Sequence, residues 1–198
     1  MKSVESVKSV VTERLLLRPY ELADATAFFA VLDQSRARLR LSFPERLRAV
    51  SDLATAETQL ADFAHDWRTG RFYVLGIWHR LTAAYLGDIC LMPQHDGQAE
   101  IGYYLAPEAE GHGYAREALA AVCEFGFGEV GATQLLIRCF ADNARAQAVA
   151  LALEFLLQRP QPELGRASWF RFSFWDSSPP RPAILHFVRQ RPGRDNPR

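Results

Sequence analysis

The segment AEIGYYLAPEAEGHGYAREA, residues 99–118, decides the fold of this chain. Its first part alternates in the period-two pattern of a strand, with three larger apolar residues on one side: Ile101, Tyr103 and Leu105. Pro107 ends that strand. The pattern then becomes helical, with apolar residues three and four positions apart at Leu119, Val122, Cys123 and Phe127. The segment therefore predicts a strand, a loop, and a helix that begins near residue 113.

The loop between this strand and this helix contains Gly111 and Gly113, which allow the backbone to turn tightly and to approach a ligand closely. A loop that leads into a helix leaves backbone N–H groups without acceptors, and the helix dipole adds to their attraction for an anion. The chain has no GxxxxGK[ST], which disfavours a nucleoside triphosphate loop, and no third glycine completes GxGxxG after Gly111 and Gly113, which disfavours a dinucleotide-binding loop. The loop therefore predicts a site for a phosphate or a pyrophosphate.

This segment resembles the acetyl-coenzyme A loop of the GNAT N-acetyltransferases, whose pattern is Q/R-x-x-G-x-G/A. It is most similar to the RimJ/RimL-type branch, the ribosomal-protein N-terminal acetyltransferases, in which EIGYWL.PE.WGKGYATEAL is typical. The resemblance is colinear over residues 11–157, with further matches in TERLLLRP at 12–19, Gly87, NARA at 143–146 and Phe155. Within these motifs the chain departs from the family pattern at Glu110, His112, Ala152 and Glu154, whereas Glu108 departs from the broad pattern but is common in this branch.

The resemblance implies an α/β fold. No internal repeat or low-complexity linker divides the chain, so we expect one domain, residues 11–190, with flexible termini at 1–10 and 191–198. We expect the GNAT fold, a mixed sheet of about six to seven strands flanked by about four helices. Strands 99–105 and 134–140 should splay apart, with the cofactor in the gap. Because Glu154 replaces the usual glycine cap, the last helix is expected to run on through Leu156 and Leu157.

Periodicity along the rest of the chain predicts the other elements. Strands are expected at 12–18, 71–79, 84–92, 134–140, near 168–175 and at 183–189. Helices are expected at 21–33, 51–68, 113–128 and 143–157, and residues 36–50 form an arginine-rich connection.

The composition excludes several classes of protein. The formal net charge is zero, so no global basic field favours nucleic acid. The three cysteines lie in apolar patterns and indicate reduced core residues, and the histidines are too scattered to suggest a metal site. No apolar run has the length of a signal or a membrane span. We expect a cytoplasmic protein that binds no metal, nucleic acid or membrane, as a monomer or a homodimer.

The resemblance implies acetyl transfer from acetyl-CoA to a primary amine. Glu100 is the candidate general base, through a water, and the backbone N–H of Tyr104 or a neighbour is the candidate donor to the thioester oxygen. The candidate cofactor-binding residues are Glu110, Gly111, His112, Gly113, Tyr114, Ala115 and Asn143. Two of these candidates have a plainer interpretation. Glu100 could pair with an arginine, and Asn143 could cap the helix that follows it.

Two features leave the function open. Ala146 and Ala150 stand where the family carries a serine or a tyrosine, so no general acid can be named on that helix and water would protonate the thiolate. The arginines of residues 36–48 could favour an acidic acceptor or could form a solvated, partly paired surface. A peptide or protein α-amine is the favoured acceptor. The alternatives are a small-molecule amine and a degenerate module that binds acyl-CoA without catalysis.

Overall fold

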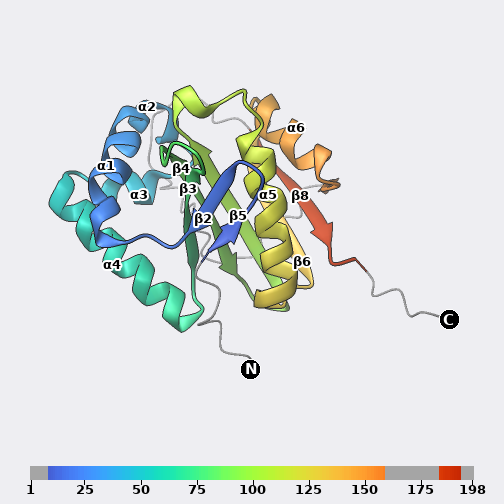
Figure 1. Cartoon of the computed structure of the whole chain (residues 1–198). Coiled ribbons are helices and arrows are strands. Elements are labelled where there is room, and N and C mark those ends of the chain that lie inside the picture. The colour runs from blue at the N-terminus through green and yellow to red at the C-terminus, as the bar shows by residue number, and fades with distance from the viewer. Residues whose placement is uncertain (1–8, 159–182, 193–198) are drawn as a thin grey trace, which may run out of the picture.

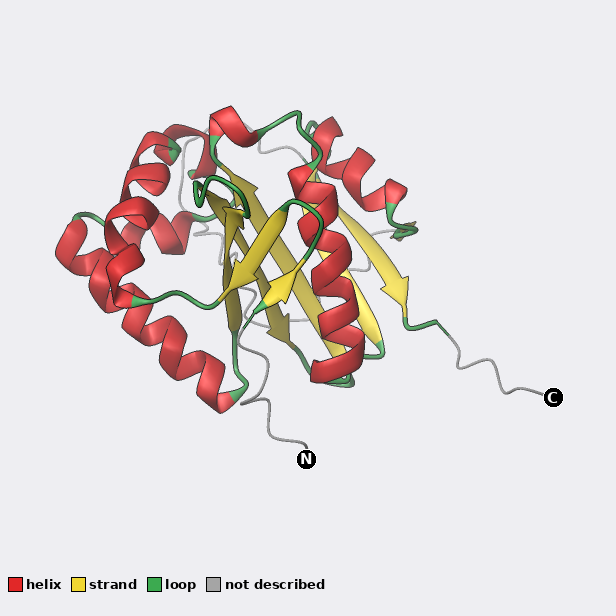
Figure 2. Cartoon of the chain, viewed as in Figure 1, coloured by secondary structure: helices red, strands yellow, loops and turns green. Residues whose placement is uncertain are grey.

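The computed structural model describes residues 9–158 and 183–192, which form a mixed α/β structure around one sheet (Figures 1 and 2). The sheet has eight strands in the order β1-β2-β3-β4-β5-β6-β8-β7. Their bounds are β1 Val10–Val11, β2 Leu15–Arg18, β3 Tyr73–His79, β4 Tyr85–Pro93, β5 Gln98–Leu105, β6 Gln134–Phe140, β7 Leu156–Gln158 and β8 Ile184–Gln190. The predicted strand near 168–175 lies outside the described residues.

The pairing of β5 with β6 is parallel, whereas the other neighbouring strands pair antiparallel. The parallel pairing ends at Ile101 and Ile137. Beyond this point β5 stays paired with β4 as far as Leu105, and β6 stays paired with β8 as far as Phe140. The two strands therefore separate over their last residues, as the resemblance implies.

Helices cover both faces of the sheet, which explains why β3 is buried almost throughout. Figure 1 shows α5 across one face, and α1 and α4 on the other. Alternate residues of β3 accordingly enter two cores, Leu75 and Ile77 beneath α5, and Val74 and Trp78 beneath α1 and α4. The helices are α1 Ala25–Gln34, α2 Arg36–Leu39, α3 Pro44–Ala49, α4 Leu53–Thr69, α5 Tyr114–Phe125 and α6 Ala144–Ala152.

The ends of the helices follow local signals in the sequence. Asp52 caps α4 by accepting the N–H of Thr55 at 2.8 Å, and Gly70 ends that helix in the left-handed region at φ 69°. The 3₁₀ turn Leu22–Asp24 precedes α1, and a π-helical turn, Gly126–Val130, follows α5. The predicted helices at 21–33, 51–68 and 113–128 therefore correspond to these elements within a few residues.

Residues 36–50 are not a simple connection, because they contain the two short helices α2 and α3. Pro44 occupies the first position of α3, where its missing N–H costs no helical hydrogen bond. The strand count also exceeds the expected six to seven, because the two-residue β1 and the three-residue β7 lengthen the sheet at its edges. The described residues contain six α-helices where four were expected, α2 and α3 being the short additions.

The prediction that the last helix continues through Leu156 and Leu157 is wrong. The helix α6 ends at Ala152, and Glu154 adopts the left-handed conformation at φ 62° that a glycine usually provides. Phe155 then donates its N–H to the carbonyl of Ala150 and is fully buried. Glu154 thus ends the helix although its Cβ disfavours the left-handed conformation. Burial of Phe155 and the pairing of β7 with β8 together hold the chain in this turn.

We expect Glu154→Gly to raise the free energy of unfolding by about 0.5–1 kcal/mol, measured by urea denaturation. A left-handed residue with a Cβ costs about 1–2 kcal/mol, from which the greater unfolded-state entropy of glycine subtracts about 0.5–1 kcal/mol. The exposed contact of Glu154 with Arg189, at 3.6 Å, adds little. Glu154→Ala is the control, since it keeps the strain and should show no gain. No increase with glycine would contradict a strained turn at this position.

Candidate active site

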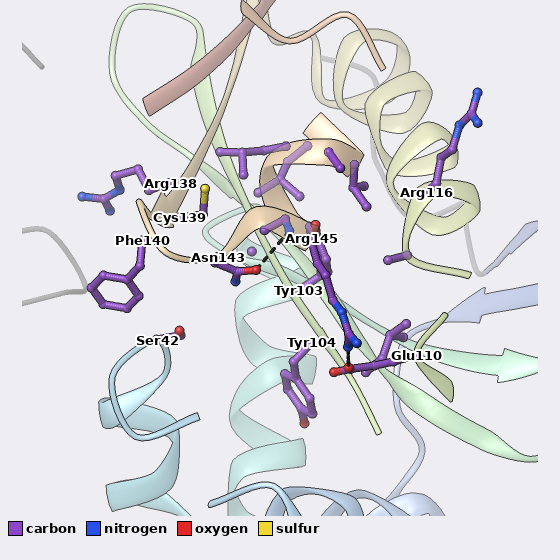
Figure 3. A pocket seen from close by; sticks show the side chains of 18 of the residues that line it. Ser42, Tyr103, Tyr104, Glu110, Arg116, Arg138, Cys139, Phe140, Asn143 and Arg145 are labelled. Carbon is purple, nitrogen blue, oxygen red and sulfur yellow. Dashed lines mark hydrogen bonds and ion pairs between the residues drawn. The ribbon is translucent and has the colours of Figure 1, made fainter. Parts of the chain in front are cut away.

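The separation of β5 from β6 opens a cavity of about 660 Å³ (Figure 3). Its walls are the last residues of the two strands, the first turns of α5 and α6, and the turn between α2 and α3. Nine site residues were predicted. Six of them line the cavity from the loop and the helix starts: Glu110, Gly111, Gly113, Tyr114, Ala115 and Asn143. Glu100 and Tyr104 line it as well, whereas His112 does not.

The loop before α5 has the backbone that the sequence predicts. Gly111 and Gly113 are left-handed, at φ 80° and 81°, and Gly113 is the residue that precedes the helix, without any side-chain cap. The N–H groups of the first helical turn have no acceptor within the helix. A Cβ on Gly111 would meet nothing within 4 Å, so the loop is open on that side. The loop can therefore present several amides to one anion.

Arg14 holds this loop from outside the cavity. Its guanidinium donates to the carbonyl of His112 at 2.9 Å and to Glu117 at 2.7 Å, and it lies 4.8 Å from the ring centre of Tyr114. Burial acts against ionisation of Glu117, but hydrogen bonds from Thr12 and Arg14 lower the pKa of that carboxyl. The sequence pattern indicated no role for Thr12, Arg14 or Glu117 in this loop, although Arg14 belongs to the TERLLLRP motif.

His112 lies on the outer side of the loop. Its ring stacks on that of Tyr114, with the ring centres 5.6 Å apart, and its Nδ1 is 2.8 Å from the carbonyl oxygen of Glu110. These contacts shape the loop, and its side chain does not line the cavity.

The carboxylate of Glu110 lines the cavity, and two arginines face it. Arg38, from α2, lies 2.9 Å from one carboxylate oxygen. Arg145, from the start of α6, donates to the other, as Figure 3 shows. Arg145 is 82% exposed at its side chain, so this pair is weak and can exchange partners. An anion entering the cavity would therefore find two cations beside the open amides of the loop.

Glu100 lines the cavity from β5, one residue before the last position at which β5 pairs with β6. Arg138, from β6, donates to both of its carboxylate oxygens, at 2.8 and 2.7 Å, and the two side chains are each 9% exposed. The pairing with an arginine, the plainer interpretation of Glu100, is thus present in the structure. An arginine within the apolar strand QLLIRCF was a signal for this partner in the sequence.

The backbone of β5 presents amides to the cavity. In an antiparallel ladder, hydrogen-bonded positions alternate. Ala106 donates its N–H to Leu86 at 2.8 Å, which places Tyr104 among the residues whose amides face β4. Its neighbours Tyr103 and Leu105 accordingly turn their backbone groups toward the gap, and the carbonyl of Leu105 accepts from Arg38 at 3.0 Å. The amides at the gap are therefore those of the neighbours of Tyr104.

The side chain of Tyr104 points to the opposite face of the sheet and joins a buried polar cluster. Arg46 donates to Asp88 there, and Tyr20 donates to the same carboxylate at 3.2 Å. Burial raises the pKa of the Asp88 carboxyl, against the opposing effect of Arg46. The side chain of Arg46 is thus buried and paired with Asp88 within the core.

Other arginines of the 36–48 segment also have partners within the protein. Arg36 donates to Asp33 at 2.6 Å and to the carbonyl of Val50 at 2.6 Å, and Arg48 pairs with Glu45. Arg38 is the member of this group that lines the cavity. Most of the segment therefore follows the plainer interpretation, a partly paired surface.

Asn143 combines two roles that the sequence left open. Its Oδ1 accepts the N–H of Ala146 at 3.1 Å and so caps α6, while the residue also lines the cavity. The side-chain NH₂ group remains on the cavity side of this cap (Figure 3).

The sequence matches the family described as "Acetyltransferase (GNAT) domain" over residues 14–156, which is most of the chain. The chain belongs to the GNAT acetyltransferase family. It is 28% identical over 146 residues to the uncharacterized N-acetyltransferase YoaA of Bacillus subtilis, a match that covers 73% of this chain and 80% of that protein. Membership of this family makes the chain an acetyl-CoA-dependent N-acetyltransferase.

Two solved structures with a similar fold contain coenzyme A or acetyl-CoA. The ribosomal L7/L12 α-N-protein acetyltransferase RimL, in complex with coenzyme A through a disulfide to one of its cysteines, is 17% identical with a TM-score of 0.74, covering 91% of this chain and 96% of that one. The microcin C7 self-immunity acetyltransferase MccE, in complex with acetyl-CoA and AMP, is 16% identical with a TM-score of 0.72, covering 93% and 97%. At these identities, both similarities establish the shared fold.

Within residues 9–158 and 183–192, no three or more His, Cys, Asp or Glu side chains gather as the ligands of a metal ion would. In the same ranges, no helix is long and apolar enough to cross a membrane.

Proposed function

We propose that this GNAT acetyltransferase acetylates the free α-amine of a peptide or protein N-terminus, with acetyl-CoA bound in the cavity between β5 and β6. The observation that carries this proposal is the continuity of the cavity, which runs from the amides before α5 to the point where the strands part. A cofactor with phosphates at one end and a thioester at the other matches such a site.

The phosphate end of acetyl-CoA would lie at the loop. The amides of residues 111–115 would donate to the pyrophosphate, and Arg38 and Arg145 would exchange Glu110 for phosphate oxygens. The pantetheine arm would then follow the exposed edge of β5, past the NH₂ group of Asn143. This path would put the thioester between the unpaired ends of β5 and β6, near Cys139.

Reaction requires a neutral amine, a donor to the thioester oxygen and a means of stabilising the leaving thiolate. The amides of Tyr103 and Leu105 face the gap and would donate to that oxygen. Glu100 would accept the proton of the incoming ammonium through a water, with Arg138 fixing the orientation of the carboxylate. Holding the amine and the thioester in line contributes much of the remaining acceleration.

An α-amine suits this site better than a lysine side chain. Its pKa is about 7.7–8.0, against about 10.4 for lysine, so a larger share is neutral near pH 7. A single carboxylate acting through water is then a sufficient base. RimL acts on the α-amine of a ribosomal protein, which supports this choice, whereas MccE, crystallised with AMP, supports a small-molecule acceptor as the second candidate.

The test compares thiol release from acetyl-CoA with peptides of one sequence, each prepared with a free or a blocked N-terminus. We expect release with the free peptides and none above background with the blocked ones. Polyamines, aminoglycosides and amino acids form the comparison panel. Release with polyamines alone, or equal rates for free and blocked peptides, would exclude the α-amine. Binding of acetyl-CoA without release for any acceptor would identify the non-catalytic module.

A further inference from the structure

Tyr103 carries a hydroxyl group that has no function in the mechanism above. This hydroxyl oxygen is buried and has no hydrogen-bond partner among the described residues, although Tyr103 lines the cavity. Buried polar groups in native proteins nearly always have a partner, and an exception indicates a missing water, ion or ligand. The hydroxyl is therefore a hydrogen-bond donor with no acceptor among the described residues.

The position of Tyr103 relates it to the gap between the strands. It lies two residues beyond Ile101, where pairing with β6 ends, and Cys139 lies two residues beyond Ile137. Had the parallel pairing continued, the two residues would face one another, and both extend to the side of the sheet that α5 and α6 cover. Figure 3 shows Tyr103 reaching toward the first turn of α6, while Tyr104 points away from it.

We infer that the Tyr103 hydroxyl donates a hydrogen bond to the sulfur of the acyl-thioester and stabilises the thiolate as it leaves. This inference rests on the proposed function, since it requires coenzyme A in the gap. It assigns Tyr103 a catalytic role that the small residues of α6 cannot fill, because Ala146 and Ala150 have no donor in their side chains.

Other hydroxyl groups of the described cavity wall lie elsewhere. Ser42 belongs to the turn between α2 and α3, Tyr114 to the phosphate end at the start of α5, and Tyr104 to the opposite face of the sheet. The thiol of Cys139 is a weak donor. Tyr103 is thus the hydroxyl placed beside the gap itself.

The step balances without another reactant. The amine nitrogen bonds to the carbonyl carbon, the carbon–sulfur bond breaks, and its electron pair passes to sulfur, which the phenol O–H then solvates. The ammonium first loses one proton through a water to Glu100, which passes it to solvent. The nitrogen loses a second proton to water as the amide forms, and the thiolate takes one proton from water after it leaves. Burial raises the pKa of Tyr103, so the phenol keeps its proton and remains a donor throughout.

The direct test measures the thiol pKa of coenzyme A bound to the protein, followed through the ultraviolet absorbance of the thiolate. A hydrogen bond to a charged sulfur stabilises the thiolate, so we expect Tyr103→Phe to raise this pKa by about one unit, a tenfold change in the ionisation constant. With a peptide acceptor, kcat should fall by about tenfold to a hundredfold while the dissociation constant of coenzyme A changes by less than about threefold.

The control is Tyr73→Phe, which removes a buried hydroxyl on β3 outside the cavity wall and should change neither quantity. Circular dichroism and thermal melting establish that both variants fold. An unchanged thiol pKa and an unchanged kcat in folded Tyr103→Phe would overturn the inference. Failure of the wild-type protein to bind coenzyme A would instead refute the proposed function.

Discussion

Replacing Gly113 by valine is expected to weaken the binding of coenzyme A by about a hundredfold while the protein remains folded. Gly113 lies at φ 81°, where a β-branched residue is strained, and it supplies the turn that aims the first amides of α5 at one point. A displaced loop would lose two or three charge-assisted hydrogen bonds to the pyrophosphate, and each 1.4 kcal/mol corresponds to about tenfold in affinity. Isothermal titration with coenzyme A measures this change.

Gly131→Val provides a matched control for backbone strain. Gly131 is also left-handed, at φ 78°, and a Cβ there would meet nothing within 4 Å. It ends the π-helical turn and does not line the cavity. Both variants should lose comparable stability, but only Gly113→Val should lose affinity. Wild-type affinity in folded Gly113→Val would remove the phosphate site from this loop.

The second large effect concerns Glu100. If this carboxylate is the base, Glu100→Gln should lower kcat by about a hundredfold with little change in coenzyme A affinity, and the acid limb of the rate profile should disappear. Rates with a free peptide N-terminus, measured across pH, provide both quantities. An unchanged rate and pH profile would leave Glu100 as the structural partner of Arg138 alone.

Arg138→Gln separates these two roles of Glu100. This variant keeps the carboxylate and removes the two hydrogen bonds that orient it. If Glu100 is the base, the Arg138→Gln variant should remain active. The acid limb of its pH–rate profile should move to higher pH, because loss of the cation favours the protonated carboxyl of Glu100. If the pair is only structural, Glu100→Gln and Arg138→Gln should show similar losses of activity, since each leaves one buried charge or amide without its partner. Melting temperatures of both variants report that structural cost.

The sequence was most informative where one local signal determines the backbone. The glycines before α5 specify the left-handed loop, and the strand at 134–140 was predicted with the bounds that the structure has. The end of α6 could not be predicted, because Glu154 adopts a conformation that its side chain opposes. The cause is tertiary, since the buried Phe155 and the pairing of β7 lie outside any local pattern.

The candidate site could be predicted in its backbone more than in its side chains. Amides and glycines follow from the loop pattern, whereas the pairing of Glu100 with Arg138 joins residues from two strands. Arg38 was indistinguishable in the sequence from arginines that pair within the core or at the surface. The buried hydroxyl of Tyr103 likewise depends on where β5 leaves β6, which alternation alone does not reveal.

The binding of acetyl-CoA between β5 and β6 is tested most directly by disulfide trapping with oxidised coenzyme A, followed by peptide mass spectrometry. All three cysteines are buried, but Cys139 lines the cavity at the gap, whereas Cys90 and Cys123 do not line it. We expect one coenzyme A adduct, on Cys139, formed faster at higher pH because burial raises the pKa of that thiol. Acetyl-CoA should protect against it, glutathione disulfide should react far more slowly, and Cys139→Ser should give no adduct. Equal labelling by glutathione disulfide, no protection by acetyl-CoA, or an adduct confined to Cys90 or Cys123 would contradict a cofactor between these strands.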